Sequence, residues 1–466
     1  MRRIARPQTL VALAAAAYAA GFATLSVLRQ RSFETGRFDL GNMVQAVWST
    51  AHGHPLQVTN LQGEQVSRLA AHVDPILVLF APLWRIWPSP EMLLVVQAIA
   101  IAAGAFPVFA LARKHLRSEL AALGFALLYL VLPAVQWLTL NEFHPVALAC
   151  PLLLFAFRYL DDDRLVPFAV CAALAAATKE EIALVVAGFG VWYALARRRQ
   201  DAGAGILAAG VLWFGLAVGV VVPHFNHGGT SSFYSRYREV GGSPGGVLRT
   251  AVTHPLRILD KAFDHRSLHY LADLAVPLAG LFVAAPLVLV AALPELALNL
   301  LSSTKTQTSI RFHYTAGLIP PLVVASVLGA ARLSAGRRRV ATALAALALA
   351  VALVENVRLG TMFKAPSSVS RHDRIAAHAL RLVPGSAVVS ATNTLGAHLS
   401  ARRRILSFPR LDDATWVAVD RTKLSYGDRS SGGRRAVAAL ARFRRNPRWR
   451  VVYARDGVLI FRRSAS

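Results

Sequence analysis

Residues 92–112 read MLLVVQAIAIAAGAFPVFALA and are followed at residues 113–117 by RKHLR. The apolar run carries no charge, and at about 1.5 Å per residue it is long enough to cross a hydrocarbon core of about 30 Å. The basic run that ends it is typical of the cytoplasmic end of a transmembrane helix. This stretch therefore predicts a membrane-spanning helix that ends in the cytoplasm.

The composition of the whole chain favours the same class of protein. Of 466 residues, 55% are hydrophobic and 16% charged, and the mean hydropathy is +0.45. A soluble protein of this size has too little interior to bury so much apolar surface. The net charge of +26 suits loops that meet anionic headgroups, and apolar runs separate the basic ones, so no nucleic-acid partner is expected. Cys150 and Cys171 lie within apolar runs and are expected to be core residues rather than a disulfide or a metal pair.

The N-terminal segment is basic up to Arg6 and apolar from Leu10 to Leu28. Because the apolar run is long enough to cross a bilayer, we interpret it as an uncleaved first span rather than a signal peptide, with a cytoplasmic N-terminus. Alternating basic loops then predict about eleven spans in the plasma membrane. The stretch 271–301 is either one long tilted helix or two short spans broken near Pro286, and the positive-inside bias favours two.

Loop lengths divide the chain into two predicted domains. Residues 1–360 form a transmembrane domain with a first outer loop at 29–90 and a second, glycine-rich one at 224–270. Within the first loop, the apolar run from Pro75 to Trp87 would span only about 20 Å, so we expect an interfacial or re-entrant helix. Residues 361–466 are expected to form a basic soluble α/β domain outside the cytoplasm.

The tail has short apolar runs that are typical of β-strands. These runs are Ala387–Ser390, Ile405–Phe408, Trp416–Val419, Val451–Tyr453 and Gly457–Phe461. The segment Ala436–Phe443 is expected to be helical. The positive charge of the tail suits binding to anionic lipid or cell-wall polymer, but a basic solvated face explains it equally well.

Uncommon polar side chains gather where predicted spans reach the outer surface. They are Asp39, His72, Asp74, Glu142, His144, Lys179, Glu180, Glu181, Arg311 and His313. They are far apart in sequence, yet folding would bring the outer loop ends into one ring. Ionisable groups at a membrane boundary are costly unless paired or solvated, so this shared placement indicates a site.

Some of these residues also have an ordinary structural interpretation. Asp39 could cap the helix that follows it. His72 and Asp74 could start the short helix at Pro75. Glu142 and His144 have a spacing that could hold a metal, but two ligands are a weak metal signal and a polar turn is the alternative.

The remaining charged residues leave alternatives open in the same way. Lys179 and Glu180 could form an intramolecular ion pair. Arg311 and His313 are of the type expected for contact with a phosphate, or they could pair with structural partners. The shared location of these groups carries the prediction, rather than any one of them.

Several short motifs in fixed order resemble the DUF2079 family of bacterial and archaeal membrane proteins over nearly the whole chain. The motifs are Phe38-Asp39-Leu40-Gly41 with Gln45, Trp48 and Gly53, His72-Val73-Asp74-Pro75, Pro82-Leu83, Glu142-Phe143-His144-Pro145, Thr178-Lys179-Glu180-Glu181, Pro294-Glu295-Leu296, Asn299-Leu300-Leu301-Ser302-Ser303 and His313-Tyr314. That family is similar to the GT-C superfamily of membrane glycosyltransferases, which take sugars from polyprenyl-phosphate donors. The resemblance implies an inverting transferase with a GT-C-like helical fold.

The same resemblance implies roles for individual residues. Asp39, in the first outer loop, matches the acid of GT-C enzymes and would be the general base for an acceptor hydroxyl. The leaving lipid phosphate would need positive partners such as Arg311, His313 or Lys179, and we expect Glu142, His144 and Glu180 to bind substrate with them.

One departure from the GT-C pattern bears on the base and on the metal. Many GT-C enzymes carry a pair of acids here, whereas Asp39 is flanked by Phe38 and Leu40. Participation of a divalent metal is therefore left open, as is a catalytic contribution from His72 and Asp74.

Two other functions are compatible with the sequence. A transporter or flippase of a lipid-linked or anionic solute would place polar groups on broken helices within the membrane, and Glu295 and Asn299, beyond the break near Pro286, fit that pattern. A scaffold would gather cell-wall polymer on its basic tail. No repeat relates the two halves of the chain, and the charged motifs lie at span ends, so the transferase is favoured.

Overall fold

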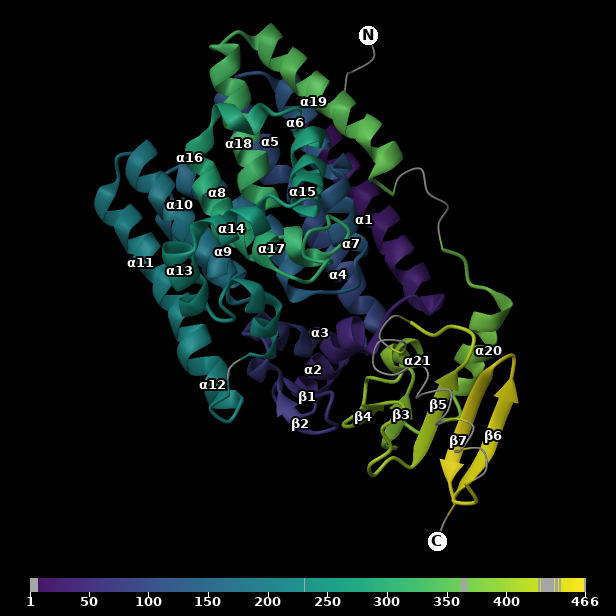
Figure 1. Cartoon of the computed structure of the whole chain (residues 1–466). Helices are drawn as coiled ribbons and strands as arrows, with labels where there is room; N and C mark the ends of the chain where they lie inside the picture. Colours follow the sequence, from purple (N-terminus) through teal and green to yellow (C-terminus); the bar gives the residue numbers. More distant parts are fainter. Residues whose placement is uncertain are drawn as a thin grey trace, which may run out of the picture.

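The computed structural model describes residues 7–229, 231–361, 367–425, 428, 440, 443 and 446–464. Helices α1 to α19 form one body, and a small sheet lies at one end of it (Figure 1). Helix α1 starts at the end of this body away from the sheet and runs towards it (Figure 1). The chain is a mostly helical, multi-span membrane protein with a small C-terminal mixed sheet, as predicted.

Among the described residues, four helical segments are long and apolar enough to cross a membrane. They are α1 (Pro7–Arg31), α4 with α5 (Pro90–Ala103 and Ala105–Leu116), α11 with η5 and α12 (Gln200–Leu216, Ala217–Val221 and Val222–Phe225) and α19 (Arg338–Arg358). The pair α6 (Glu119–Val131) and α7 (Pro133–Leu140), bent by 45°, adds a fifth if it is one span. Only 22%, 17% and 28% of the apolar windows of α1, α11 and α19 are buried, as expected for helices that face lipid.

Shorter apolar helices complete the body. They are α8 (Ala149–Asp161), α9 (Leu165–Ala176), α10 (Ile182–Ala196) and α18 (Ile319–Ser334), with the turn η4 (Pro145–Leu148) before α8. These helices correspond to spans expected from the sequence, but helix length alone supports only four or five spans. Helices α10 and α11 approach closely because Gly190 and Gly203 face each other's backbone, as small residues do in membrane helix pairs.

The stretch that the sequence left open forms neither one long helix nor two regular spans. It consists of α15 (His265–Ala275), η7 (Val276–Leu278), η8 (Leu281–Ala284), α16 (Pro286–Leu289), η9 (Val290–Ala292) and α17 (Leu293–Leu301). Ala279 and Gly280 are both left-handed, with φ of 51° and 68°, and end one helical segment. Pro286 begins another, because proline has no amide hydrogen to continue the preceding turn.

The two long loops that the sequence predicts on the outer side, called here the first and second outer loops, are also largely helical. The first contains η1 (Arg37–Gly41), α2 (Asn42–Ala51), the hairpin β1 and β2 (Gln57–Thr59 and Gln65–Ser67), η2 (Arg68–Ala70), η3 (Pro75–Phe80) and α3 (Ala81–Ile86). The second contains η6 (Ser232–Val240), α13 (Pro244–Thr253) and α14 (Pro255–Ala262), and η10 (His313–Thr315) precedes α18. The short helix predicted from Pro75 to Trp87 is thus present as η3 and α3.

The C-terminal sheet has the strand order β4-β3-β5-β7-β6. Its elements are α20 (Arg371–Leu380), β3 (Val389–Ala391), α21 (Asn393–His398), β4 (Ile405–Ser407), β5 (Trp416–Asp420), β6 (Trp449–Arg455) and β7 (Val458–Arg463). Strand β3 is parallel to β4 and β5, whereas β7 is antiparallel to β5 and β6. Each predicted strand is present. The helix predicted at Ala436–Phe443 lies outside the described residues except for Leu440 and Phe443, which are buried.

A histidine joins three parts of this small domain. His372, near the start of α20, has Nε2 2.7 Å from Asp420 Oδ2 at the end of β5 and Nδ1 3.0 Å from Asp456 Oδ2 in the β6–β7 turn. Burial lowers the pKa of His372, but the hydrogen bonds and charges of the two aspartates outweigh it and raise the pKa above its usual value. The imidazolium form therefore stabilises the domain.

We expect His372→Ala to lower the unfolding free energy of the C-terminal domain by about 1.5–3 kcal/mol at pH 6, the usual value of hydrogen bonds to a charged group. A histidine whose pKa is raised on folding contributes its full stabilisation at pH values below its unfolded-state pKa of about 6.5. This stabilisation is lost as pH rises through the folded-state pKa. Hydrogen exchange of β5 and β7 in the intact protein at pH 6 and pH 9 measures this. The matched control is His378→Ala, an exposed histidine of the same helix. An equal effect of His372→Ala at both pH values would contradict the ionic role.

Candidate functional site

The turn that carries Asp39 is η1, which follows α1. The Glu142 carboxylate holds the backbone of this turn, because it accepts hydrogen bonds from the amides of Gly36 (3.1 Å) and Leu40 (2.8 Å). Glu142 lies in the loop after α7, with φ of 53°. The side chain of Asp39 itself stays 55% exposed. Glu142 thus fixes the turn and leaves the Asp39 carboxylate accessible.

The partner of Asp39 is His144. Asp39 Oδ1 lies 3.4 Å from His144 Nε2, and His144 Nδ1 lies 2.7 Å from the carbonyl oxygen of Asn141. Because a carbonyl only accepts, Nδ1 carries a proton, and the ring is oriented with Nε2 towards Asp39. Desolvation raises the pKa of Asp39, but the hydrogen bond and charge of His144 and the charge of Arg68 hold this pKa below its usual value. Asp39 is therefore ionised at neutral pH.

The two carboxyl groups of this turn differ in pKa. Burial and the nearby charge of Asp39 raise the pKa of Glu142 to about 8, although the amides of Leu40 and Gly36 oppose this. Neighbouring carboxyl groups whose environments separate their pKa values usually have different roles. Here Asp39 can accept a proton at neutral pH, whereas Glu142 supports the backbone.

His313 lies against His144 on the side of η10. The two rings stack with centroids 3.8 Å apart, and the His313 amide donates to Asn141 Oδ1 at 3.1 Å. Burial lowers the pKa of His313 well below its usual value, and the positive charges of Lys179 and Arg236 lower it further. His313 is therefore a neutral ring within reach of several cationic groups.

His72 and Glu180 connect the first outer loop to the end of α9. Glu180 Oε1 lies 3.0 Å from His72 Nδ1, and Glu180 Oε2 accepts a hydrogen bond from the Val73 amide at 2.9 Å. The His72 ring also stacks on Phe233 of the second outer loop at 4.4 Å. One carboxylate thus ties two loops together.

Next to this pair, Lys179 and Arg236 lie around one tyrosine. Lys179 forms an ion pair with Glu181, rather than with Glu180, and its Nζ is 5.6 Å from the Tyr314 ring centroid. Arg236 Nη1 donates to the Tyr314 hydroxyl at 3.2 Å, and its guanidinium lies over Phe233 at 4.5 Å. Arg236 forms no ion pair with a carboxylate in the described part of the chain, so its charge is available.

Two of the site residues predicted from the sequence, Asp74 and Arg311, lie apart from these groups. Asp74 Oδ2 accepts hydrogen bonds from Arg68 at 2.9 Å, and its side chain is 2% exposed. Arg311 is exposed, and its guanidinium lies 5.6 Å from the ring centroid of Trp137. Neither residue contacts Asp39.

We call the converging groups the outer-loop cluster. It consists of Asp39, His72, Glu142, His144, Lys179, Glu180, Arg236 and His313. Two residues that matter here were missed from the sequence. Arg236 lies in a loop without a recognisable motif. Gln97, the single polar residue of the apolar run at 92–112, donates to the carbonyl of Thr139 at 3.0 Å and accepts from the His144 amide at 3.1 Å. An isolated glutamine in a span was a signal that could have found it.

The donor atoms of the cluster do not fit a metal site. No group of three His, Cys, Asp or Glu side chains within the described ranges could hold a metal ion. Asp39 and His144 supply two donors only, and the second nitrogen of His144 is bonded to the Asn141 carbonyl.

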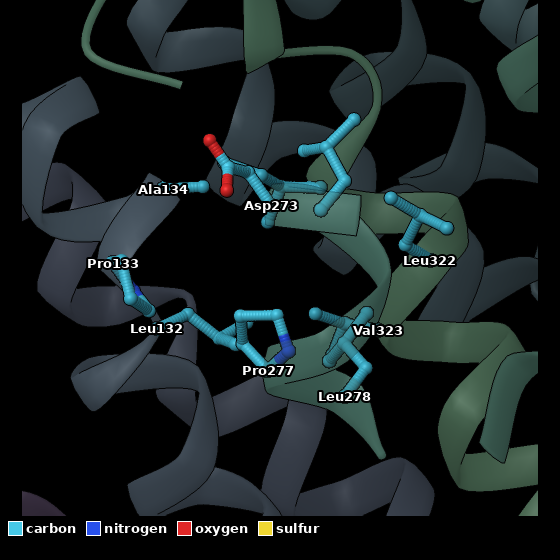
Figure 2. A pocket seen from close by; sticks show the side chains of 10 residues that line it. Leu132, Pro133, Ala134, Asp273, Pro277, Leu278, Leu322 and Val323 are labelled. Carbon is cyan, nitrogen blue, oxygen red and sulfur yellow. The ribbon is translucent and has the colours of Figure 1, made fainter. Parts of the chain in front are cut away.

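Two cavities lie away from the cluster. Figure 2 shows the first, lined by Leu132, Pro133, Asp273 and Pro277 among others, with a volume of about 10 Å³. That is room for about one water molecule and not for a sugar. The second, about 330 Å³, lies beside α14 and is lined by Lys261 and Asp264 among others.

A further polar group lies deeper in the helical body. Glu295 of α17 is 4% exposed, and its Oε1 accepts a hydrogen bond from the Gly317 amide at 3.3 Å, while Oε2 has no partner among the described residues. Asn299, one turn later, donates to the Tyr270 hydroxyl (3.0 Å) and to the Tyr314 carbonyl (2.7 Å). These residues reach the outer-loop cluster through Tyr314.

Known proteins are similar to this chain in sequence or in architecture. Residues 29–460 match a family model described as "Predicted membrane protein (DUF2079)". No curated protein matches the sequence. The crystal structure of ArnT from Cupriavidus metallidurans bound to undecaprenyl phosphate is similar, with a TM-score of 0.55, 13% identity and 98% of both chains covered. The apo structure of that ArnT gives a TM-score of 0.48 at 12% identity, over 96% of this chain and 98% of the other. ArnT is a GT-C glycosyltransferase, and the likeness shows a shared fold.

Proposed function

The chain belongs to the DUF2079 family of membrane proteins and has a GT-C fold, and from this premise we propose that it transfers a sugar from a polyprenyl-phosphate donor to an extracytoplasmic acceptor. The ArnT structure with the same fold holds undecaprenyl phosphate, which supports a donor of this chemical class. The N-terminus would lie in the cytoplasm, with the outer-loop cluster and residues 361–466 on the other side.

Asp39 is proposed as the general base. Its ionised carboxylate would take the proton of an acceptor hydroxyl as that oxygen attacks the anomeric carbon. The bond between this carbon and the phosphate oxygen would break, and the polyprenyl phosphate would leave with the electron pair, so that the sugar inverts. His144 would orient the carboxylate, and Glu142 would hold the turn that carries it. His72 and Asp74 remain predictions as catalytic residues, and their contacts favour a supporting role.

The phosphate is proposed to bind at the cationic side of the cluster. Lys179 Nζ and the Arg236 guanidinium lie 5.6 Å and 5.9 Å from the centroid of the Tyr314 ring. Cations placed where a leaving group gains charge stabilise the transition state. His313 is proposed to line the site as a neutral ring, with its Nδ1 bonded to Asn141 Oδ1 at 3.2 Å. Arg311, which is exposed and lies apart from the cluster, is proposed to meet the lipid phosphate before it reaches the site.

The proposal rests on the convergence of an ionised, accessible carboxylate, Asp39, with two cations, Lys179 and Arg236, from loops far apart in sequence, of which Arg236 forms no ion pair among the described residues. The test uses the protein in lipid nanodiscs with a panel of polyprenyl-phosphate sugars, and it follows the release of free polyprenyl phosphate. Release that depends on an added acceptor supports a transferase. No release from any donor contradicts it.

We expect Arg236→Met to weaken donor binding by about 10–100-fold, because a charged hydrogen bond to phosphate contributes about 1.5–3 kcal/mol. The maximal rate should change much less than the half-saturating donor concentration. Titration of donor into the nanodisc sample measures both. The control is Arg249→Met, an exposed arginine of the same outer loop. Equal weakening in both variants would point to general attraction by positive charge rather than to a phosphate contact.

A second candidate function is transport of a lipid-linked or anionic solute. The buried Glu295 and the chain of short helices from residue 276 to 301 favour it, because transporters place polar groups on broken helices. Flux of an anionic solute into liposomes that is lost in Glu295→Gln, together with no release of polyprenyl phosphate, would support this alternative. The basic tail is proposed to meet anionic lipid or cell-wall polymer in either case.

A further inference from the structure

The turn that carries Asp39 is held from a second side, by the C-terminal domain. Helix α21 packs directly on η1. The side chain of Asn393, the first residue of α21, accepts a hydrogen bond from the Phe38 amide at 3.4 Å. Elements separated by more than 350 residues therefore meet at the proposed base.

Arg37, two residues before Asp39, makes the strongest connection. Its guanidinium is 3% exposed and donates to Ser407 Oγ (2.6 Å), to the Ile405 carbonyl (2.7 Å) and to the Thr59 carbonyl (2.8 Å). One side chain thus links η1, the end of β1 and strand β4 of the C-terminal sheet. It forms no ion pair with a carboxylate among the described residues. Burying a positive charge among neutral acceptors alone is energetically costly. That the fold nevertheless buries Arg37 indicates that its hydrogen bonds between η1, β1 and β4 are important.

A glutamine reinforces the same contact. Gln45 of α2 donates to the carbonyls of Arg402 (3.2 Å) and Arg403 (2.9 Å) and accepts from the Thr59 amide at 2.9 Å. Thr59 Oγ1 in turn accepts from the Ile405 amide at 3.2 Å. The first outer loop and the C-terminal domain are therefore joined by hydrogen bonds between the Gln45 and Thr59 side chains and the domain backbone as well as by Arg37.

Two glycines at the ends of the turn permit this close contact. A Cβ at Gly41 would lie 2.6 Å from Ser400 Oγ, and a Cβ at Gly36 would lie 2.7 Å from Asn393 Nδ2. Both distances are too short for any side chain. The turn and α21 therefore pack closely together, so a shift of the C-terminal domain would also move the turn.

We propose that Arg37 is a positioning residue, and that the C-terminal domain, docked through α21 and β4, sets the place of Asp39 for the transfer reaction. This inference rests on the proposed function. The domain would then be part of the active centre rather than only a surface for polymer or lipid. Small displacements of a reacting group cost up to about 100-fold in rate, so loss of the dock should lower the turnover number rather than donor binding.

The test compares Arg37→Met with Arg374→Met in the full chain in nanodiscs. Arg374 is the control, because it lies in α20 of the same domain, is exposed and donates to the Val369 carbonyl at 3.0 Å, away from the contacts with η1. Arg37→Met should lower kcat for polyprenyl-phosphate release about 10–100-fold with KM within about twofold. It should also increase hydrogen exchange at residues 36–41 at least about 10-fold. Arg374→Met should change both within about twofold.

The exchange measurement separates this inference from the proposed function. If wild-type protein releases no polyprenyl phosphate from any donor, the function fails, and exchange at residues 36–41 alone decides whether Arg37 positions the turn. Unchanged exchange and unchanged kcat in Arg37→Met overturn the inference, as does an equal effect of Arg374→Met. If Arg37→Met does not fold, Ser407→Ala removes one of its three hydrogen bonds and should give a smaller change in the same direction.

Discussion

Asp39→Asn is expected to lower the release of polyprenyl phosphate by about 10²–10⁴-fold, the usual contribution of a general base. The amide is nearly the same size and can still contact His144, but it cannot take a proton from an acceptor hydroxyl. Donor binding should change little, because Asp39 pairs with His144 and forms no ion pair with Lys179 or Arg236 among the described residues. Initial rates over the donor panel, with binding measured separately, check both expectations.

A matched control excludes a general effect of removing a half-exposed carboxylate. Asp413 of the C-terminal domain is 51% exposed and pairs with Arg404, so Asp413→Asn should keep its activity within about twofold. The pH profile gives an independent check. Because the pKa of Asp39 lies below its usual value, the rate should not fall on the acid side near neutral pH. A fall in rate on the acid side near neutral pH would give the role of base to a group other than Asp39. An Asp39→Asn variant that keeps its full rate would exclude Asp39 as the base.

Much of the fold follows from local features of the sequence. The apolar run at 92–112 forms one span made of α4 and α5. Gly104 and Pro107 are the residues in this run that disfavour a helix, and the span continues past both of them. The strands of the tail follow from short apolar runs between turn residues. The segment after Pro277 could not be predicted in the same way. Its hydropathy is that of a span, but prolines and a left-handed Ala279-Gly280 pair divide it into single turns.

The candidate site was partly predictable for a different reason. Charged residues at span ends are visible in one sequence, and folding brings most of them into contact, as with Asp39 and His144 or His72 and Glu180. Which partner each one takes depends on loop geometry. Lys179 bonds to Glu181 rather than to its direct neighbour, because successive residues of the turn point in different directions.

Contacts between the two ends of the chain left no local signal at all. Arg37 reads as an ordinary loop arginine in the sequence, and nothing near Ser407 or Ile405 indicates a partner more than 360 residues away. Arg236 likewise lies in no recognisable motif, and it becomes a candidate site residue only because the rings of Phe233 and Tyr314 fold beside it. Long-range packing, rather than motif, determines these residues.

Lys179→Met is expected to remove activity through two separable effects. The Lys179 side chain is 15% exposed and forms an ion pair with Glu181. The charge of Glu181 also acts on the nearby carboxyl group of Glu295. Removing one partner of a buried ion pair usually costs about 3–5 kcal/mol, because the other charge is left unpaired. The variant should therefore unfold at a lower temperature and also bind the donor phosphate about 100-fold more weakly.

The double variant Lys179→Met with Glu181→Gln separates the two effects. The amide removes the unpaired charge, so stability should return to within about 1 kcal/mol of wild type, as often happens when both members of a buried pair are replaced. Donor binding should stay weak, because the cation proposed to meet the phosphate is still absent. Thermal unfolding in nanodiscs and donor titration measure the two quantities on the same sample. Recovery of both in the double variant would mean that Lys179 only balances Glu181, and the phosphate contact would then fall to Arg236. Recovery of stability alone makes Lys179 a binding residue whose ion pair with Glu181 holds it ready for the donor.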